Sequence, residues 1–363
     1  MIYRALLAKG FKIDIFTRLE SGEPKPLKKN LVNVFEIPFE RSSKAHVMER
    51  DFDEGKSFVE GMVKSSYFNP TDYLCIHTHH WTSGIDLPSY LPESCRLIHT
   101  PHLLALEKCH YNGLTCPSYV EVAERKLFDR SEAIFALSNA ESDAMRIKYG
   151  VQHDKLIVTP NGISPQFFRI IPRNSLSRGK LSLLCVGRIC LQKGIDILLD
   201  AVSSLIMDGV PTELYLAGGP YGESDYENNI AERIAAPPLR GKVFPIGKVS
   251  HSIIPKLLSR CNVYVQPSRY ESQGIALVEA MAAGRAVVAS NLPAVKEYLT
   301  HNSNGLLFEP GNAKALTKML LSLYSNPDRL KSFGLAARTS ARSFTWDKML
   351  ERALPIIING NLK

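Results

Sequence analysis

Short apolar segments alternate with longer segments of helical spacing along most of this 363-residue sequence. Residues 133–137, 181–186 and 263–266 are three of the apolar runs. Such alternation predicts parallel sheets whose two faces are covered by helices. Ligands of such sheets bind at the carboxyl ends of the strands. The sequence therefore predicts an α/β protein with its functional residues at the carboxyl edge of a sheet.

The alternation assigns an element to most of the chain. Ser138 and Glu141 have the spacing of a capping box, and Gly10 that of a C-terminal cap. The expected strands are 12–17, 31–37, 73–77, 96–100, 133–137, 181–186, 214–217, 243–246, 263–266 and 286–289. Residues 156–159 close the first half and residues 305–308 follow the last of these strands, with no element assigned to either. The expected helices are 2–9, a stretch within 42–66, 121–130, one from 139, 195–207, one from 274, 313–324 and the remainder to about 358.

Length and composition bound the class of protein. A chain of 363 residues exceeds one usual core, and the Pro- and Ser-rich stretch 172–180 is a linker after which the alternation restarts. No apolar run approaches the roughly 20 residues of a membrane span. The seven cysteines are scattered and form no C-x-x-C pair. We therefore expect two globular domains in a reducing, cytoplasmic setting.

The net charge of +8 is confined to the second half of the chain. Residues 1–167 carry 20 basic and 21 acidic side chains, whereas residues 168–363 carry 24 basic and 15 acidic ones. No basic run or basic stripe with interleaved aromatics accompanies the excess, which argues against nucleic-acid binding. A phosphate-bearing small ligand of the second half fits the charge, and a solvated basic face is the alternative.

Two glutamates flank a predicted strand-to-helix junction. Glu271 lies in the loop after strand 263–266, and Glu279 lies about one turn into the helix that Gly274 opens. The N–H groups of the first helical turn lack intrahelical partners, so this stretch could bind hydroxyls and an anion together. A helix cap and a solvated side chain would give the same spacing.

Cations and histidines follow other strands. Arg188 and Lys193 come after strand 181–186 and could hold a diphosphate without a metal, although ordinary surface cations would look the same. Neither a Walker A motif nor G-x-G-x-x-G is present. A rim of histidines follows two strands of the first half, and strand alternation argues against zinc there. Two interpretations remain open for His77, His79, His80, His99 and His102. Such a histidine either binds a sugar hydroxyl or phosphate, or is a buried structural residue.

An ordered set of motifs extends over nearly the whole chain. The segments are Pro160-Asn161-Gly162-Ile163, Val186-Gly187-Arg188 with Lys193-Gly194, Pro267-Ser268-Arg269-Tyr270-Glu271 with Gly274, Glu279-Ala280-Met281-Ala282-Ala283-Gly284 and Asn304-Gly305-Leu306-Leu307-Phe308. The set resembles the retaining glycosyltransferases of family 4, which have a GT-B fold. The resemblance implies two Rossmann-like domains with a cleft between them, at 1–167 and 168–340, and a final helix within 341–363 that returns to the first domain.

The resemblance also implies roles for individual residues. Glu271 would bind donor-sugar hydroxyls and Glu279 the ribose, while Arg188 and Lys193 would bind the diphosphate. Gln273 and the backbone of Gly274 and Ile275 would complete the donor site. His102 would lie near the reaction centre, so that His102, Arg188, Lys193 and Glu271 form the catalytic set. No metal and no cofactor are expected, since the nucleotide sugar is a substrate.

The segments 77–84 and 98–105 are similar to the branch with sucrose-phosphate synthases and the mycothiol-pathway N-acetylglucosaminyltransferase. That branch implies a small soluble acceptor, with Lys44 and His80 on the acceptor side. An arginine expected to assist Lys44 falls near the apolar Val120, so a phosphorylated acceptor is not implied. The family's first strand and Gly-rich loop would precede Met1. We therefore expect an N-terminally incomplete first domain.

The resulting hypothesis is retaining transfer of a hexose or N-acetylhexosamine from a UDP-type sugar to a hydroxyl of a small acceptor. A truncated or inactive protein that binds nucleotide sugar without turnover is the alternative. A GT-B epimerase or phosphorylase fits the donor motifs less well. Partners are expected to be small molecules, without nucleic acid or stable membrane insertion, and the sequence leaves the oligomeric state open.

Overall fold

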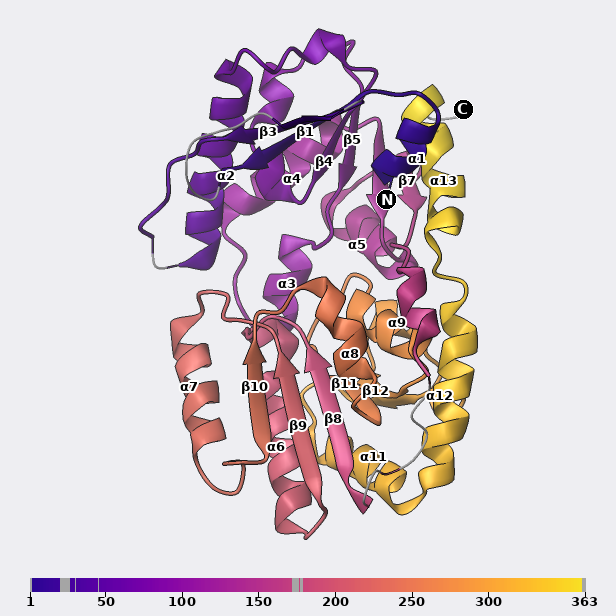
Figure 1. Ribbon diagram of the computed structural model, residues 1–363. Helices are drawn as coiled ribbons and strands as arrows, with labels where there is room; N and C mark the ends of the chain where they lie inside the picture. Colours follow the sequence, from indigo (N-terminus) through magenta and orange to yellow (C-terminus); the bar gives the residue numbers. More distant parts are fainter. Residues whose placement is uncertain are drawn as a thin grey trace. The chain divides into compact units, whose positions relative to one another are not determined.

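The computed structural model describes residues 2–19, 27–29, 31–44, 46–171, 176 and 179–360. Its internal contacts divide the chain into two compact units. Unit 1 comprises residues 1–110, 114–160 and 346–363, and unit 2 comprises residues 111–113 and 161–345. Figure 1 shows the helices and strands of both units. The predicted linker at 172–180 lies mostly outside the described residues.

Unit 2 is built on a six-stranded sheet in which every neighbouring pair of strands is parallel. Because all strands run the same way, the loops that follow them meet at one edge. The spatial order is β10-β9-β8-β11-β12-β13. The strands are β8 (Leu181–Val186), β9 (Thr212–Ala217), β10 (Val243–Gly247), β11 (Val263–Gln266), β12 (Ala286–Ser290) and β13 (Leu306–Phe308).

Both faces of this sheet are buried under helices, as Figure 1 shows for α6, α11 and α8. Val263 and Val265 of β11 join the core under α6, α11 and the first part of α12, whereas Tyr264 between them joins the opposite core under α8 and α9. This period-2 distribution explains the continuous apolar run of the strand. The helices are α6 (Ile195–Met207), α7 (Ser224–Ala235), α8 (Ile254–Leu258), α9 (Ile275–Ala282), α10 (Pro293–Lys296), α11 (Ala313–Ser325) and α12 (Pro327–Ala341).

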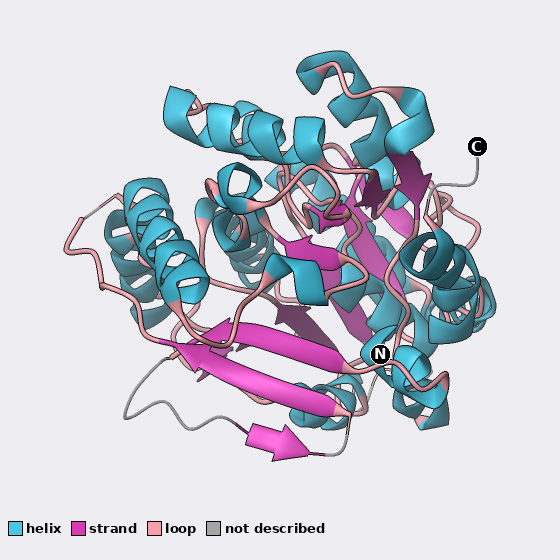
Figure 2. Cartoon of the chain, turned by 90° about the horizontal axis from the view of Figure 1, so that it is seen from above, coloured by secondary structure: helices cyan, strands magenta, loops and turns pink. Residues whose placement is uncertain are grey.

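The strands of unit 1 form two sheets among the described residues. A parallel sheet has the order β4-β5-β6-β7, and a second sheet has the order β1-β3-β2, with β2 antiparallel to β3. Figure 2 shows the strands against the helices around them. The strands are β1 (Ile13–Arg18), β2 (Leu27–Lys29), β3 (Val32–Ile37), β4 (Ile76–His79), β5 (Leu97–Thr100), β6 (Ala133–Ala136) and β7 (Leu156–Val158).

Helices also cover the four-stranded sheet of unit 1. On one face, Ile98 and Phe135 pack against the C-terminal helix α13. Ile134 and Ala136 point to the other face and pack with residues of α4 and α5. The helices are α1 (Ile2–Ala8), α2 (Val47–Lys64), α3 (Ala105–Tyr111), α4 (Ser118–Arg130), α5 (Asn139–Tyr149) and α13 (Trp346–Asn359).

Most predicted elements are confirmed, including the bounds of β8, β11 and α6. The predicted strand 73–77 is displaced, because β4 begins at Ile76. The physical reason is that Tyr73 packs in an aromatic cluster with Phe16 and Phe68, and its hydroxyl donates to Asp14 (3.0 Å). The antiparallel strand β2, the strands β7 and β13 and the helices α3 and α7 were not predicted.

The capping box at the start of α5 is confirmed with a shift of one residue. Ser138 Oγ accepts from the Glu141 N–H at 3.0 Å, as predicted. The Glu141 carboxylate accepts from the Leu137 N–H at 2.7 Å, one residue before the cap. Both bonds satisfy N–H groups near the helix start, which is the purpose of such a box.

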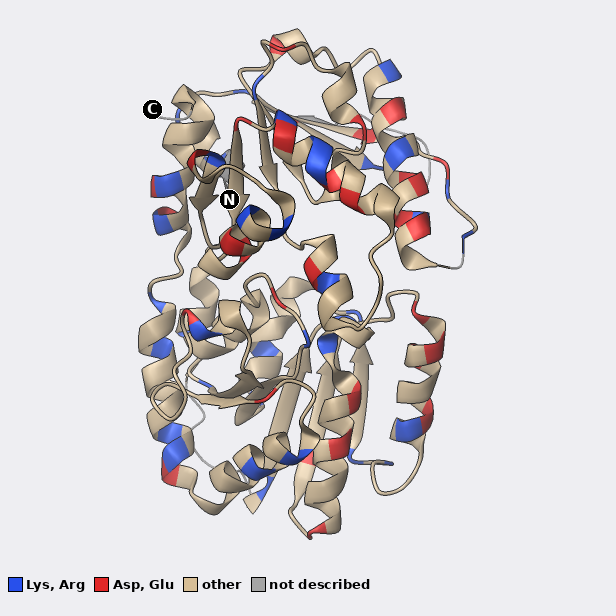
Figure 3. Cartoon of the chain, turned by 180° about the vertical axis from the view of Figure 1, so that it is seen from behind, with Lys and Arg blue, Asp and Glu red and all other residues tan. Residues whose placement is uncertain are grey.

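Charged side chains are carried mainly by helices and loops, whereas the strands carry few of them, as Figure 3 shows from one side. Basic and acidic residues are interspersed along these helices in that view. Among the helices that the structure describes, none has both the length and the apolarity to cross a lipid bilayer.

A buried arginine holds the segment between α9 and β12. Arg285 is fully buried, and its guanidinium donates to the carbonyl oxygens of Cys261 (2.9 Å), Ile171 (2.9 Å) and Ala283 (3.0 and 3.2 Å). Such bonds satisfy carbonyls that would otherwise be buried without a donor.

We predict that Arg285→Met destabilises unit 2 by about 2–4 kcal/mol, because these carbonyls lose their donors while side-chain volume is kept. Guanidinium denaturation together with hydrogen exchange of the β12 amides measures the effect. The exposed Arg240 supplies the control, and Arg240→Met should change stability by less than about 0.5 kcal/mol. Equal denaturation midpoints for the two variants would contradict the prediction.

Candidate active site

The turn between β11 and α9 holds a buried carboxylate beside a lysine. Glu271 is 8% exposed, and its Oε1 accepts from Lys193 Nζ at 2.6 Å and from Ser268 Oγ at 2.7 Å. Lys193 comes from the short 3-10 turn Leu191–Lys193 after β8. No bond to Oε2 of Glu271 is seen among the described residues, so this oxygen can accept from further hydroxyl donors.

A second ion pair holds these two loops together. Arg269 donates to both carboxylate oxygens of Asp196 at 2.9 and 2.7 Å, and its backbone N–H donates to the carbonyl of Gln192 at 2.8 Å. Burial alone would raise the pKa of Asp196, but hydrogen bonds from Arg269 and Tyr226 lower it. The forked pair therefore fixes the start of α6 against the turn that carries Glu271.

Glycine occupies two positions at which the backbone packs closely against neighbouring atoms. Gly194 has φ +63°, and a Cβ there would lie 2.1 Å from the carbonyl oxygen of Pro267. Gly274 has φ +78°, and a Cβ there would lie 2.6 Å from Gln266 Nε2. Any other residue at either position would be strained, and at Gly194 its Cβ would also push the turns after β8 and β11 apart. The predicted helix start at Gly274 is confirmed, since α9 begins at Ile275.

Gln273 uses its side chain inside unit 2. Its Oε1 accepts from the Asn161 N–H at 2.9 Å, and its Nε2 donates to the Asn161 carbonyl at 3.0 Å. The Gln273 carbonyl accepts from the Tyr298 hydroxyl at 2.5 Å. These bonds tie the Pro160-Asn161-Gly162 turn to the start of α9. A direct contact of the Gln273 amide with a donor stays a prediction.

The second glutamate of the motif pairs with a histidine that follows β10. Glu279 is 5% exposed, and its Oε1 lies 2.6 Å from His251 Nε2. Burial raises the pKa of Glu279, and the bond to His251 opposes that shift. The exposed imidazole of His251 is bonded to one carboxylate oxygen. The described residues leave Oε2 without a bond. Glu279 therefore combines a fixed orientation with an open acceptor.

Arg188 lies at the same carboxyl edge. Its guanidinium stacks on the ring of Tyr221, with Cζ 3.8 Å from the ring centroid. Such stacking orients the planar group and leaves its N–H donors at the rim available for an anion. Within unit 2 the turns after four neighbouring strands thus supply Arg188 and Lys193 after β8, Tyr221 after β9, His251 after β10 and Glu271 after β11.

Several histidines of unit 1 are hydrogen-bonded to another histidine or to a threonine. His79 Nδ1 lies 2.9 Å from His102 Nε2, and His77 Nε2 lies 2.8 Å from Thr100 Oγ1. The buried His99 places Nδ1 2.8 Å from Thr78 Oγ1. Two residues of this group have positive φ angles, His80 (65°) and His102 (58°). Strained backbone of this kind costs about 1–3 kcal/mol and concentrates at functional sites.

Burial lowers the pKa of four of these imidazoles and makes them poor bases, namely His77, His79, His99 and His102. It lowers the pKa of His102 to about 4, with the neighbouring His79 adding to the effect. It also lowers the pKa values of His77 and His99 well below the ordinary value. Across the described ranges, no group of three or more His, Cys, Asp and Glu side chains is arranged to hold a metal ion. At neutral pH the cluster therefore offers neutral donors and acceptors of hydrogen bonds.

The acceptor-side residues are not brought together by any contact that the structure describes. Lys44 is exposed in the segment before α2, where its backbone N–H donates to Ser42 Oγ at 3.3 Å. His80 places Nδ1 3.0 Å from Thr82 Oγ1. Val120, where the resemblance would place an arginine, is fully buried in the core of unit 1.

Sequence reasoning missed the partners of the predicted residues, namely Ser268, His251, Tyr298 and Tyr221. His251 and Tyr221 follow strand ends, so the carboxyl-edge rule could have drawn attention to them. The same rule applies to Ser268, which lies two positions after β11. Tyr298 gives no such signal, because its contact depends on how the turns fold.

Both halves of the chain match models of known protein families. Residues 1–167 match the model described as Glycosyltransferase Family 4, and residues 167–340 match Glycosyl transferases group 1. The D-inositol 3-phosphate glycosyltransferase of Rhodococcus erythropolis is 25% identical over 379 residues, covering 98% of this chain and 85% of that protein.

Two solved structures share the fold over most of their length. Sucrose-phosphate synthase from Thermosynechococcus elongatus has a TM-score of 0.82 and 22% identity, covering 98% of this chain and 90% of that one. Anabaena Alr3699/HepE in complex with UDP and glucose has a TM-score of 0.72 and 19% identity, covering 90% and 85%.

Two Rossmann-like units with parallel sheets define a protein of the GT-B class, as predicted. The chain belongs to glycosyltransferase family 4, a retaining family whose members use nucleotide sugars. This confirms the family that the sequence motifs indicated. The predicted absence of a first strand and Gly-rich loop stays a prediction.

We predict that His102 remains neutral down to about pH 4, whereas an unperturbed histidine is protonated near pH 6.5. Because its folded pKa is depressed, its contribution to stability is present above about pH 6.5 and is lost as the pH falls toward 4. NMR titration of ring-labelled histidine measures the midpoint, and His102→Asn assigns the resonance. A midpoint near 6.5 in the folded protein would contradict the prediction.

Proposed function

We propose that this chain transfers a hexose or N-acetylhexosamine from a UDP-sugar, with retention, to a hydroxyl of a small soluble acceptor. The observation that carries the proposal is the buried Glu271 held by Lys193 and Ser268 at the start of α9. This arrangement combines an oriented acceptor for sugar hydroxyls with a cation for phosphate oxygens.

Lys193 can serve both groups at once. An ammonium has three N–H donors, so its single bond to Glu271 leaves two for a diphosphate. Arg188, oriented by Tyr221, is the second proposed diphosphate ligand. The N–H groups of Gly274 and Ile275 at the start of α9 add further donors for the sugar or the phosphate.

Glu279 is the proposed ribose ligand. His251 holds one of its oxygens, and the other can accept from a ribose hydroxyl. His102 of unit 1 is the proposed contact to the outer hydroxyls of the donor sugar. Its low pKa fits a neutral hydrogen-bonding role rather than that of a general base at neutral pH.

In the proposed reaction the bond from the anomeric carbon to the diphosphate oxygen breaks, and the acceptor oxygen bonds to that carbon on the same face. The acceptor proton passes to the leaving diphosphate. Negative charge builds on the diphosphate, so Arg188 and Lys193 are the main stabilisers of the transition state. Glu271 then need not act as a nucleophile, and we propose that no metal is required.

The acceptor is proposed to be small and rich in hydroxyls. The name of one similar protein refers to D-inositol 3-phosphate, which is such a molecule. Lys44 and His80 are the proposed acceptor-side residues. The apolar Val120 gives no support to a second phosphate ligand.

Calorimetry with UDP, UDP-glucose and UDP-N-acetylglucosamine, run beside an assay of donor hydrolysis and transfer, tests the proposal. We expect binding of UDP and turnover of one of the two sugars. Binding without turnover by the full chain would favour the non-enzymatic alternative, and failure to bind any of the three would overturn both.

We predict that Lys193→Met lowers kcat by about 100-fold or more, since one donor to the departing diphosphate is worth about 10²–10³ in rate. Initial-rate kinetics and UDP calorimetry measure the effect. Lys180 supplies a matched control, because it also pairs with a glutamate of unit 2, Glu213 at 2.5 Å. Lys180→Met should leave kcat within about twofold, and equal losses in both variants would count against the assignment.

A further inference from the structure

The segment that carries His102 is held at both ends. It comprises residues 101–104, between the last residue of β5, Thr100, and the first residue of α3, Ala105. Thr100 is fixed by its place in the sheet, opposite His79 of β4. The position of the His102 imidazole therefore depends on what fixes the start of α3.

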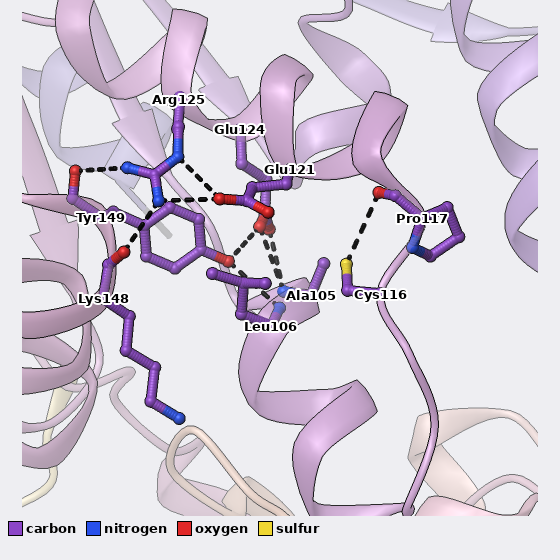
Figure 4. A network of polar contacts seen from close by, with 9 residues as sticks. All are labelled: Ala105, Leu106, Cys116, Pro117, Glu121, Glu124, Arg125, Lys148 and Tyr149. Atoms are coloured by element: carbon purple, nitrogen blue, oxygen red, sulfur yellow. Dashed lines mark hydrogen bonds and ion pairs between the residues drawn. The ribbon is translucent and has the colours of Figure 1, made fainter.

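A buried glutamate from α4 binds the first N–H of that helix. Glu124 is fully buried, and its Oε1 and Oε2 accept from the Ala105 N–H at 3.0 and 3.2 Å. Figure 4 shows the carboxylate directed at this N–H. An N-terminal N–H group has no intrahelical partner, so Glu124 satisfies a donor that α3 cannot satisfy by itself.

A tyrosine from α5 binds the next N–H. The Leu106 N–H donates to the Tyr149 hydroxyl at 3.1 Å, and that hydroxyl in turn donates to Glu124 Oε2 (Figure 4). The first two N–H groups of α3 are thus bound by one connected pair of side chains. Tyr149 is itself 6% exposed and packs on Phe128 of α4.

An outer layer fixes the pair. Arg125 donates to the carbonyl oxygens of Lys148 (2.9 Å) and Tyr149 (2.8 Å) and to Glu121 Oε1 (2.7 and 2.9 Å). Its guanidinium also lies over the Tyr149 ring, with Cζ 5.3 Å from the centroid. The C-terminal end of α5 is therefore tied to α4, which sets the place of the tyrosine hydroxyl (Figure 4).

A buried carboxylate is a poor means of stabilising a fold. Removal of an acid from water is expensive, and apolar replacement of buried charged groups is often neutral or stabilising. Burial raises the pKa of Glu124 to about 8, against the opposing bonds from Tyr149 and Ala105. A fully bonded polar network instead fixes one geometry among several. The main effect of the Glu124–Tyr149 pair is therefore to fix the orientation of the start of α3.

We propose that Glu124 and Tyr149 are positioning residues, which hold the 101–104 segment so that His102 keeps its positive φ and its bond to His79. This inference rests on the proposed function of His102. A displacement of about 1 Å at a reacting group costs on the order of 100-fold in rate. Among the described residues neither side chain has a hydrogen bond or ring contact with the imidazole, so both act through α3.

The test uses Glu124→Gln and Tyr149→Phe in the full chain. Glutamine keeps the volume but replaces one of the two acceptor oxygens by an NH2 group that only donates, so the bond from the Ala105 N–H to Oε1 is lost or the side chain must turn. Phenylalanine leaves the Leu106 N–H without its acceptor. We expect kcat to fall about 10- to 100-fold while the Kd for UDP changes less than about twofold. We also expect the His102 resonance to shift and its NMR midpoint to rise from about 4 toward 6.5.

Unit 2 contains a matched pair for control. The Tyr215 hydroxyl donates to Glu213 Oε2 at 3.1 Å at a part-exposed position. Glu213→Gln and Tyr215→Phe should leave kcat and the His102 resonance as in the original chain.

Two outcomes would overturn the inference. One is a kcat and a His102 resonance in Glu124→Gln and Tyr149→Phe that match those of the controls. The other is a parallel loss of kcat, UDP affinity and thermal midpoint, which would indicate general unfolding. If the unaltered chain transfers no sugar, the proposed function fails, whereas the His102 resonance still tests the positioning role by itself.

Discussion

The close contact between the turns after β8 and β11 is the constraint on which the candidate site depends. Gly194 approaches the carbonyl of Pro267 more closely than a Cβ would allow, and the forked pair of Arg269 and Asp196 holds that approach. Lys193 is thereby brought to 2.6 Å from Glu271. The steric permission of a glycine and the directionality of a bidentate ion pair together set this geometry.

Three buried glutamates are each held by hydrogen bonds to fixed partners. Glu271 is bound by Lys193 and Ser268, Glu279 by His251, and Glu124 by a tyrosine and a backbone N–H. Carboxyl groups are costly to bury without such partners, and most of all in their charged form. The first two keep an oxygen without a bond to the described residues, which suits ligand binding. Glu124 has both oxygens bonded, which suits a role in orientation.

The sequence predicted most of the fold because periodicity and turn residues are local signals. Val263–Gln266 and Ile195–Met207 have the predicted bounds, since a continuous apolar run and a helical spacing leave few alternatives. The displaced start of β4 has a tertiary cause. The ring of Tyr73 packs on Phe16 and Phe68, and its hydroxyl donates to Asp14. A local pattern cannot report such a contact.

The sequence by itself determined the α/β class and the motif that carries Glu271 and Glu279, because each depends on residues close together in the chain. It determined the family through the order of several such local motifs along the chain. The tertiary structure decided the partners. Lys193 lies 78 positions from Glu271, and His251 lies 28 from Glu279. Separations of this size are closed only by the parallel order of the sheet, which brings the ends of β8, β10 and β11 to one edge.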